Sequence, residues 1–250
     1  MSTKKITFMD IKDNKSIIFA ALEIFFLIVG IIAFTVCVAT GRKSLYVSQM
    51  LPDNIWFNFF SYFTWQSNFF MFALCILYFF NMKFHFIKKP TFLVAGMTYI
   101  TVTFLVFNTI LLPTTLPSNL KSPLWWCLNS PVHIICPIMC LLFFIFVFKA
   151  EHKSGHFKFQ LKPINWLMFM IYPTIYVVYA VVINFVPITT YGGWDYPSIY
   201  GKFTNINPNN DGSLVYLTVI LGIELVLFPL AYLIYNSCVY KKAPWKLFTK

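Results

Sequence analysis

Six long apolar stretches, each almost free of charge, constrain the fold of this chain more than any other feature. A helix needs about 20 apolar residues to cross the core of a bilayer. Runs of that length cover residues 16–40, 56–81, 91–113, 124–148, 164–186 and 214–238. Of the 250 residues, 59% are hydrophobic and only 11% are charged, which is more apolar surface than a water-soluble fold can bury. None of the runs alternates with the period of a barrel strand, and helices satisfy their own backbone hydrogen bonds. The sequence therefore predicts an all-α, polytopic bundle of six transmembrane helices that forms one domain over residues 1–250.

The basic residues predict which way the bundle faces. The chain carries 19 Lys and Arg residues, and 15 of them lie in four segments: before the first run, between the second and third, between the fourth and fifth, and after the sixth. Positive residues concentrate in cytoplasmic loops. This distribution places both termini in the cytoplasm. It also indicates that the basic residues face membrane lipids rather than nucleic acid. It does not predict an oligomeric state.

The longest segment on the opposite side covers residues 187–213 and is rich in Gly, Pro, Asn and Tyr. Its turn-forming and aromatic residues favour an ordered lid over one mouth of the bundle, with a loose loop as the alternative. The six cysteines include no CxxC pair, so the sequence indicates neither a metal site nor a disulfide framework, and no cofactor motif is present.

Polar residues inside the apolar runs are the candidates for function, because they are costly in hydrocarbon. The second run contains the segment FTWQSN, which includes Thr64, Gln66, Ser67 and Asn68. Thr64, Ser67, Asn68 and Met71 share one helix face, so this face must point into the bundle or into a wet cavity. Hydrogen bonding between helices is the simpler explanation for such a cluster, and a functional site is the alternative.

The fourth run contains Asn129 and His133, which are four residues apart and so lie on one helix face. Pro131 and Pro137 interrupt the backbone hydrogen bonds of the same helix. An imidazole inside a span is the best candidate in the chain for acid and base chemistry. A neutral ring bonded to a neighbouring helix is the competing interpretation.

Two carboxylates, Glu23 in the first run and Glu224 in the sixth, lie deep within apolar sequence. Each needs a partner or a proton there. They could face each other, bond to Thr64 or His133, or carry protons.

The FTWQSN segment, the histidine of the fourth run, the YPTIY segment of the fifth and the WDYP segment near residue 194 together carry a resemblance. The chain resembles the androgen-induced membrane hydrolases and their uncharacterised bacterial relatives. The animal members are threonine hydrolases that split fatty-acid esters of hydroxy fatty acids. The resemblance implies that Thr64 is a nucleophile and His133 its general base, with Asn129, Gln66 or Asn68 orienting the ring or donating to the oxyanion. The abundance of Phe, Ile, Lys and Asn is typical of an AT-rich bacterial genome, which favours a location in a bacterial cytoplasmic membrane.

Three functions follow as competing hypotheses. The first is a hydrolase of lipid esters that uses Thr64 and His133. The second is a small-molecule or proton-coupled transporter that uses Glu23, Glu224 and His133. The third is a structural membrane protein whose polar residues only fix helix packing. The hydrolase requires the Thr64 hydroxyl and the His133 ring to lie within hydrogen-bond reach, beside a pocket that a lipid can enter.

Overall fold

The computed structural model describes parts of all six apolar runs. The described residues are 21–22, 24–25, 28–32, 35–36, 39, 62–79, 90–113, 122–153, 168–180, 182 and 213–240. Within these ranges all regular structure is helical, as the sequence predicts. The expected lid lies outside the described residues, apart from Ser213 at its end, and so does Glu23.

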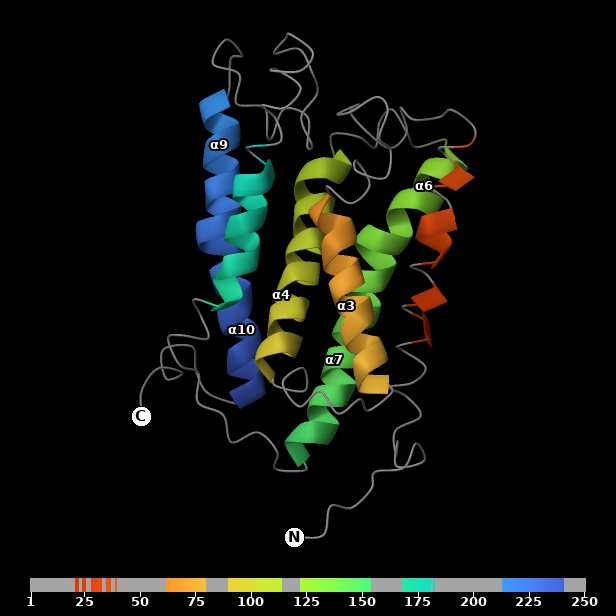
Figure 1. Cartoon of the computed structure of the whole chain (residues 1–250), viewed down its shortest axis with the longest axis vertical. Coiled ribbons are helices and arrows are strands. Elements are labelled where there is room, and N and C mark those ends of the chain that lie inside the picture. Colours follow the sequence, from red (N-terminus) through yellow and green to blue (C-terminus); the bar gives the residue numbers. More distant parts are fainter. Residues whose placement is uncertain are drawn as a thin grey trace.

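Helix α4 (Pro90–Val106) occupies the middle of the bundle. Helix α3 (Phe63–Phe79) packs on one side of it and α10 (Phe228–Tyr240) on the other, while α7 (Cys136–Lys153) also contacts it (Figure 1). A shorter apolar helix, Met168–Ala180, joins the same core through Phe169 and Tyr176. The bundle is therefore organised around α4.

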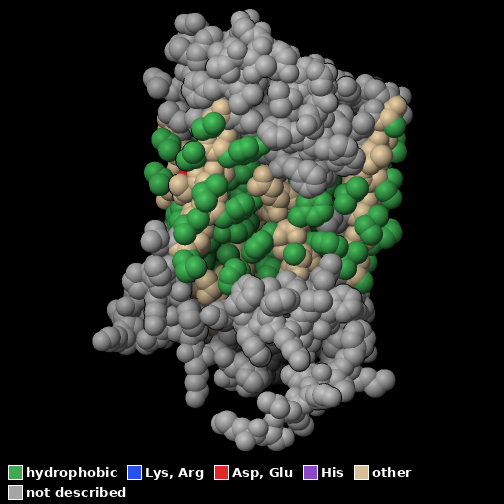
Figure 2. Space-filling view, in the orientation of Figure 1, with side chains coloured by type: hydrophobic (Ala, Val, Ile, Leu, Met, Phe, Trp, Pro, Cys, Tyr) green, Lys and Arg blue, Asp and Glu red, His purple; other side chains and the backbone are tan. Residues whose placement is uncertain are grey.

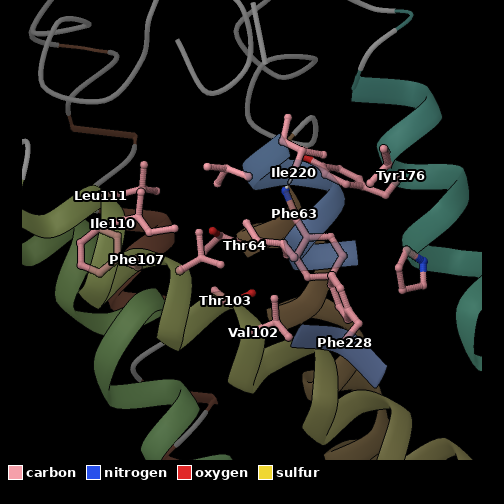
Figure 3. A pocket seen from close by; sticks show the side chains of 15 residues that line it. Phe63, Thr64, Val102, Thr103, Phe107, Ile110, Leu111, Tyr176, Ile220 and Phe228 are labelled. Carbon is pink, nitrogen blue, oxygen red and sulfur yellow. Dashed lines mark hydrogen bonds between the residues drawn. The ribbon is translucent and has the colours of Figure 1, made fainter. Parts of the chain in front are cut away.

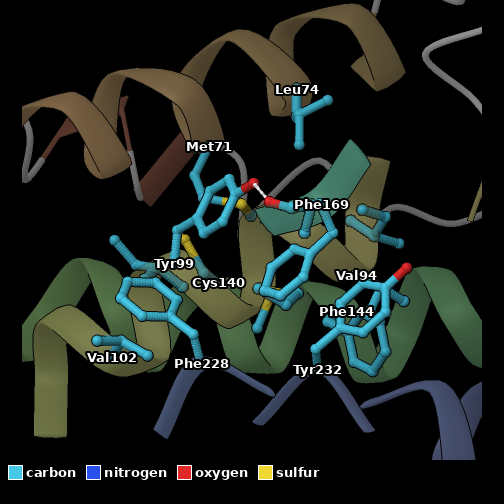
Figure 4. Packing of buried hydrophobic residues seen from close by; sticks show 14 of the residues in the cluster. Met71, Leu74, Val94, Tyr99, Val102, Cys140, Phe144, Phe169, Phe228 and Tyr232 are labelled. Atoms are coloured by element: carbon cyan, nitrogen blue, oxygen red, sulfur yellow. Dashed lines mark hydrogen bonds between the residues drawn. The ribbon is translucent and has the colours of Figure 1, made fainter. Parts of the chain in front are cut away.

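The main core lies between these helices and is dominated by aromatic rings. Tyr99 of α4 stacks on Phe169, and its hydroxyl donates to the carbonyl oxygen of Phe169 at 2.9 Å (Figure 4). Tyr232 of α10 stacks on the same ring with the two ring centroids 4.0 Å apart. Aromatic pairs of this kind add to the free energy gained by burial alone. They fix the Met168–Ala180 helix against both α4 and α10.

Three long helices each contain a π-helical segment. Helix α4 continues into η3 (Phe107–Leu111), α6 (Pro123–Ser130) continues through η4 (Pro131–Ile135) into α7, and α9 (Ser213–Gly222) continues through η6 (Ile223–Leu227) into α10. In each, the N–H of the residue that follows the segment donates to the carbonyl five residues earlier. A π segment adds one residue to a helical turn, and such segments are frequent at functional sites.

A proline follows each π segment at the second position after its end. These residues are Pro113, Pro137 and Pro229. A proline in a helix has no N–H to donate and clashes with the carbonyl four residues earlier, and the wider π turn relieves that clash. The interruption expected from Pro137 therefore takes the form of a π segment rather than a break.

Three of the described helices are long and apolar enough to cross a membrane: Thr91–Leu111, Pro123–Ile145 and Thr218–Val239, with 21, 23 and 22 residues. Helices of this length rise about 30 Å, which matches a bilayer core. Hydrophobic side chains cover the middle of the face seen in Figure 2. Large apolar side chains such as those of Ile138, Ile175 and Leu225 are exposed on the described helices. The protein is thus a helical protein with membrane-spanning character.

Candidate functional site

Thr64 and His133 lie in direct contact. The Thr64 Oγ1 atom is 3.1 Å from Nε2 of His133, although the two residues are 69 positions apart in the sequence. Thr64 lies in the first turn of α3 and is buried, and His133 is the central residue of η4 and is half-buried. Contacts between α3 and η4 bring the two helices together at this level.

The second ring nitrogen of His133 fixes the proton arrangement of the pair. Nδ1 lies 3.0 Å from the backbone oxygen of Asn129, one turn earlier in the same helix. A carbonyl oxygen can only accept, so Nδ1 carries the proton and Nε2 presents a lone pair. The Thr64 hydroxyl therefore donates to Nε2. This is the arrangement in which an imidazole can remove a proton from a hydroxyl.

Residues of η3 hold the other sides of the histidine. The ring of Phe107 stacks on the ring of His133, with the centroids 3.8 Å apart and the planes inclined by 15°. Asn108 donates from Nδ2 to its own helix at Phe104 O, at 2.7 Å, and makes a longer contact of 3.5 Å with His133 O. Stacking on one face and the Asn129 carbonyl at one edge leave the ring little freedom to rotate.

The α3 side of the site is a cluster of buried polar groups. Ser67 donates from Oγ to Thr64 O at 3.0 Å and lies 2.8 Å from Oγ1 of Thr103 on α4. Asn68 donates from Nδ2 to Thr64 O at 2.7 Å and to Val132 O at 3.0 Å. Thr64, Ser67, Asn68 and Met71 are all buried, which confirms that this helix face points into the bundle. The cluster also bonds neighbouring helices, as the simpler interpretation of the sequence expects.

A pocket opens on the other side of Thr64. It has a volume of about 110 Å³ and lies between α3, α4 and η3 on one side and the Met168–Ala180 helix, α9 and η6 on the other. In Figure 3, Thr64 lies between Phe107 and Phe63 in the pocket wall. Side-chain oxygens come from Thr64, Thr103 and Tyr176, and the rest of the lining is apolar. Thr64 and Phe107 therefore both line the pocket and contact His133, and Thr64 is the one of the two that carries a hydroxyl.

The remaining candidates from the sequence fall into two groups. Gln66 accepts a 2.7 Å hydrogen bond at Oε1 from the hydroxyl of Tyr172, on the Met168–Ala180 helix. Asn129 donates from Nδ2 to Trp125 O at 2.9 Å and contributes its backbone oxygen to the histidine. Both lie on the helices that carry the Thr64–His133 pair.

Glu224 lies apart from that pair, on η6. Its Oε1 accepts a 2.8 Å hydrogen bond from Thr174, and its Oε2 has no partner among the described residues. Of the partners expected for Glu224, Thr64 and His133 are therefore not the ones it binds. A pairing with Glu23 involves a residue outside the described ranges.

Several residues around the site escaped the sequence argument. Thr103 and Asn108 are polar residues of the third apolar run, and the same search for polar groups in hydrocarbon would have found them. Thr174 is among the polar residues that the sequence places in the fifth run, but its bond to Glu224 was not predicted. Phe107 carries no such signal, because the chain has 30 phenylalanines and nothing in the sequence distinguishes this one.

Comparisons with known proteins identify uncharacterised bacterial relatives. Residues 120–243, from α6 to α10, match a family described as protein of unknown function (DUF1600). The chain is 34% identical over 176 residues to the uncharacterized protein MG452 of Mycoplasma genitalium, a match that spans 68% of this chain and 63% of that protein. It is 28% identical over 174 residues to the MG452 homolog of Mycoplasma pneumoniae, over 68% of this chain and 67% of that one. No solved structure matches. The chain is thus similar to mycoplasma proteins of unknown function, and the stretch matched by the family model includes His133 but not Thr64.

Proposed function

We propose that this protein is an intramembrane hydrolase of lipid esters in which Thr64 is the nucleophile and His133 the general base. The observation that carries the proposal is the 3.1 Å contact between Thr64 Oγ1 and His133 Nε2, with Nδ1 held by Asn129 O. A hydroxyl becomes a useful nucleophile only when a base lies within hydrogen-bond reach, and a third group normally orients that base. Here the orienting group is a backbone carbonyl instead of a carboxylate.

The reaction follows from these positions. Thr64 Oγ1 attacks the ester carbonyl while His133 Nε2 takes the hydroxyl proton, and the ring then gives that proton to the departing alcohol. Water attacks the acyl-threonine in a second step, again with His133 as base, and the acid leaves as Thr64 recovers its proton. The second hydrogen on Asn129 Nδ2 is a candidate donor to the oxyanion. Asn68 is not, because both hydrogens of its amide already bind carbonyls.

The pocket supports a substrate with an apolar chain. Thr64 and Thr103 give it two hydroxyls near one wall, and its other walls are aliphatic and aromatic. A lipid chain that moves from the bilayer into the pocket passes from one apolar environment to another, so its transfer contributes little to specificity. Specificity would come from the position at which the ester carbonyl is held. This agrees with the lipid esters implied by the resemblance to androgen-induced hydrolases.

The proposed setting is a bacterial cytoplasmic membrane that the chain crosses six times, with both termini in the cytoplasm. Three apolar helices of sufficient length, the asymmetric distribution of lysines and the mycoplasma relatives support it. Entry of substrate would then occur sideways, from the lipid, since the pocket lies within the helical layer.

The test uses protein purified in detergent and p-nitrophenyl esters of increasing chain length, together with an alkyl fluorophosphonate. This reagent phosphonylates an activated hydroxyl, forming a P–O bond to it and releasing fluoride. We expect the wild type to hydrolyse long-chain esters and to be labelled on Thr64. Thr64→Ala should abolish labelling, and His133→Ala should slow hydrolysis by roughly 10²- to 10⁴-fold.

Two controls separate this chemistry from general damage. Thr98→Ala removes another buried threonine, whose hydroxyl donates to Val94 O in α4, and should leave labelling unchanged. Glu224→Gln should also leave it unchanged, whereas a site that works through the carboxylate would lose activity. Wild-type protein that neither hydrolyses esters nor reacts at Thr64 would refute the proposal.

A further inference from the structure

The carbonyl of Val132, next to the histidine, is left without a donor from its own helix. In an α-helix Val132 O would accept from the N–H of Cys136, but that N–H donates to Pro131 O across the π turn. In the π register the donor would be residue 137, which is a proline and has none. The π segment and Pro137 together therefore free one backbone acceptor at the site.

Asn68 of α3 supplies the missing donor. Its Nδ2 donates to Val132 O at 3.0 Å and to Thr64 O at 2.7 Å. One side-chain amide thus joins the carbonyl of the proposed nucleophile to the carbonyl of the residue before the proposed base. The orientation of the amide is determined, because turning it over would place Oδ1 against two carbonyl oxygens.

The other end of the same amide is unsatisfied. Asn68 is 1% exposed, and its Oδ1 has no hydrogen-bond partner among the described residues. Burying a polar atom without a partner costs stability, so an asparagine whose only purpose was to join two helices would be a poor choice. The cost is understandable if the two bonds from Nδ2 set a distance that matters for function.

We infer that Asn68 is the positioning residue of the proposed dyad: by bridging Thr64 O and Val132 O, it sets the reach between the Thr64 hydroxyl and the His133 ring. This inference rests on the proposed hydrolase function. Asn68 touches neither the ring nor the substrate pocket, and it acts through the backbones of the two residues that do the chemistry. Its loss should therefore slow the bond-forming step and leave binding in the pocket unchanged.

Asn236 provides a matched control elsewhere in the bundle. It too is 1% exposed, and its Nδ2 also donates to the carbonyl four residues earlier, Tyr232 O, at 2.7 Å. It lies on α10, whereas Asn68 lies on α3. Replacing either asparagine with leucine removes a buried amide of the same kind, but only Asn68→Leu removes the bridge to η4.

The experiment measures inactivation of the purified protein by the alkyl fluorophosphonate, and separates the maximal rate of labelling from the concentration that gives half of it. For Asn68→Leu we expect the maximal rate to fall by about 10- to 100-fold, as for small displacements of reacting groups, with the half-saturating concentration unchanged. For Asn236→Leu both values should equal those of the wild type. If Asn68→Leu yields too little folded protein, Asn68→Asp keeps the shape of the side chain but has at most one donor, on the protonated carboxyl, so it cannot bridge both carbonyls and the same result is expected.

The outcomes separate the two proposals. A wild type that the reagent does not label refutes the hydrolase, and the positioning role falls with it. A wild type labelled on Thr64, with an unchanged maximal rate in Asn68→Leu or Asn68→Asp, overturns the positioning role alone. So does an equal loss in Asn68→Leu and Asn236→Leu, or a loss confined to the half-saturating concentration.

Discussion

Gly96 is a position at which a single methyl group decides how α3 and α4 pack. A Cβ atom placed there would lie 2.5 Å from the sulfur of Met71 and 2.9 Å from Cδ1 of Leu74. The side chains of Met71 and Leu74 occupy the space that glycine leaves free, and small residues commonly allow such close packing between membrane helices. The position of Thr64 depends on this contact, because Thr64 lies on α3 and α3 packs against α4.

We expect Gly96→Ala to lower the free energy of unfolding by about 1–3 kcal/mol, because Met71 and Leu74 must move out of their present positions. Thermal unfolding in detergent measures the change. Gly222→Ala is the control: a Cβ there meets nothing within 4 Å, so alanine should stabilise its helix by about 0.5–1 kcal/mol. Equal effects of the two substitutions would show that helix propensity, rather than close packing, governs Gly96.

At this scale the sequence identifies candidate residues better than it predicts their arrangement. Thr64 and His133 stand out because polar side chains are rare in apolar runs. They can be identified as candidates without knowledge of the fold. The partners of Glu224 could not be predicted the same way. A carboxylate in hydrocarbon must find a donor, and the sequence offered Thr64, His133 or a pairing of the two carboxylates, whereas the structure brings Thr174 to Glu224.

At the scale of elements, the six apolar runs indicate the helices, and their boundaries agree closely where both can be compared. The fourth run, predicted over 124–148, is helical from Pro123 to Lys153, and the sixth, predicted over 214–238, is helical from Ser213 to Tyr240. The π segments were not predicted, because the hydrophobic pattern of a helix, with its period near 3.6 residues, does not reveal one extra residue in a single turn. The prolines at 113, 137 and 229 were the available signal.

Pro137 offers a direct test of the π turn. Pro137→Ala restores an N–H that can serve His133 O or Val132 O, so η4 can relax to a regular α-helix. We expect higher thermal stability, since proline inside a helix is unfavourable by about 3 kcal/mol relative to alanine. We also expect slower labelling of Thr64, because a change of register rotates His133 about the helix axis. Unchanged labelling in a more stable protein would show that the ring position does not depend on the π turn.

At the scale of the whole molecule, the distribution of charge and the arrangement of helices make a joint prediction about topology. Single cysteines introduced at Ser118 and Asn205, in a background without the six natural ones, should react with a membrane-impermeant maleimide added to intact cells. Cysteines at His85 and Ser154 should react only after the membrane is opened, because they lie in the lysine-bearing segments. Labelling of His85→Cys in intact cells would show that the orientation is the reverse of the predicted one or that the number of spans differs.

The interior of the bundle accounts for how two distant runs meet at one site. Helix α4 contacts both α3 and η4, and its continuation η3 provides the Phe107 ring against which His133 stacks. No property of the second and fourth runs alone predicts this, because the contact depends on a third helix that packs against both. The sequence therefore indicates the membrane class and the candidate polar groups, and the tertiary packing of α4 supplies their geometry.

A π turn has one residue more than an α turn. Inserting a single codon into a gene for a regular helix would add such a residue. Because the helix is regular on both sides of η4, deleting one residue there would leave Trp125 and Cys140 on the faces that they now bury. Combined with Pro137→Ala, which avoids the proline clash that the π turn relieves, the deletion would remove only the local widening that frees Val132 O and presents His133. The parts of this helix that hold the protein together and the part that faces Thr64 can thus be changed independently of each other.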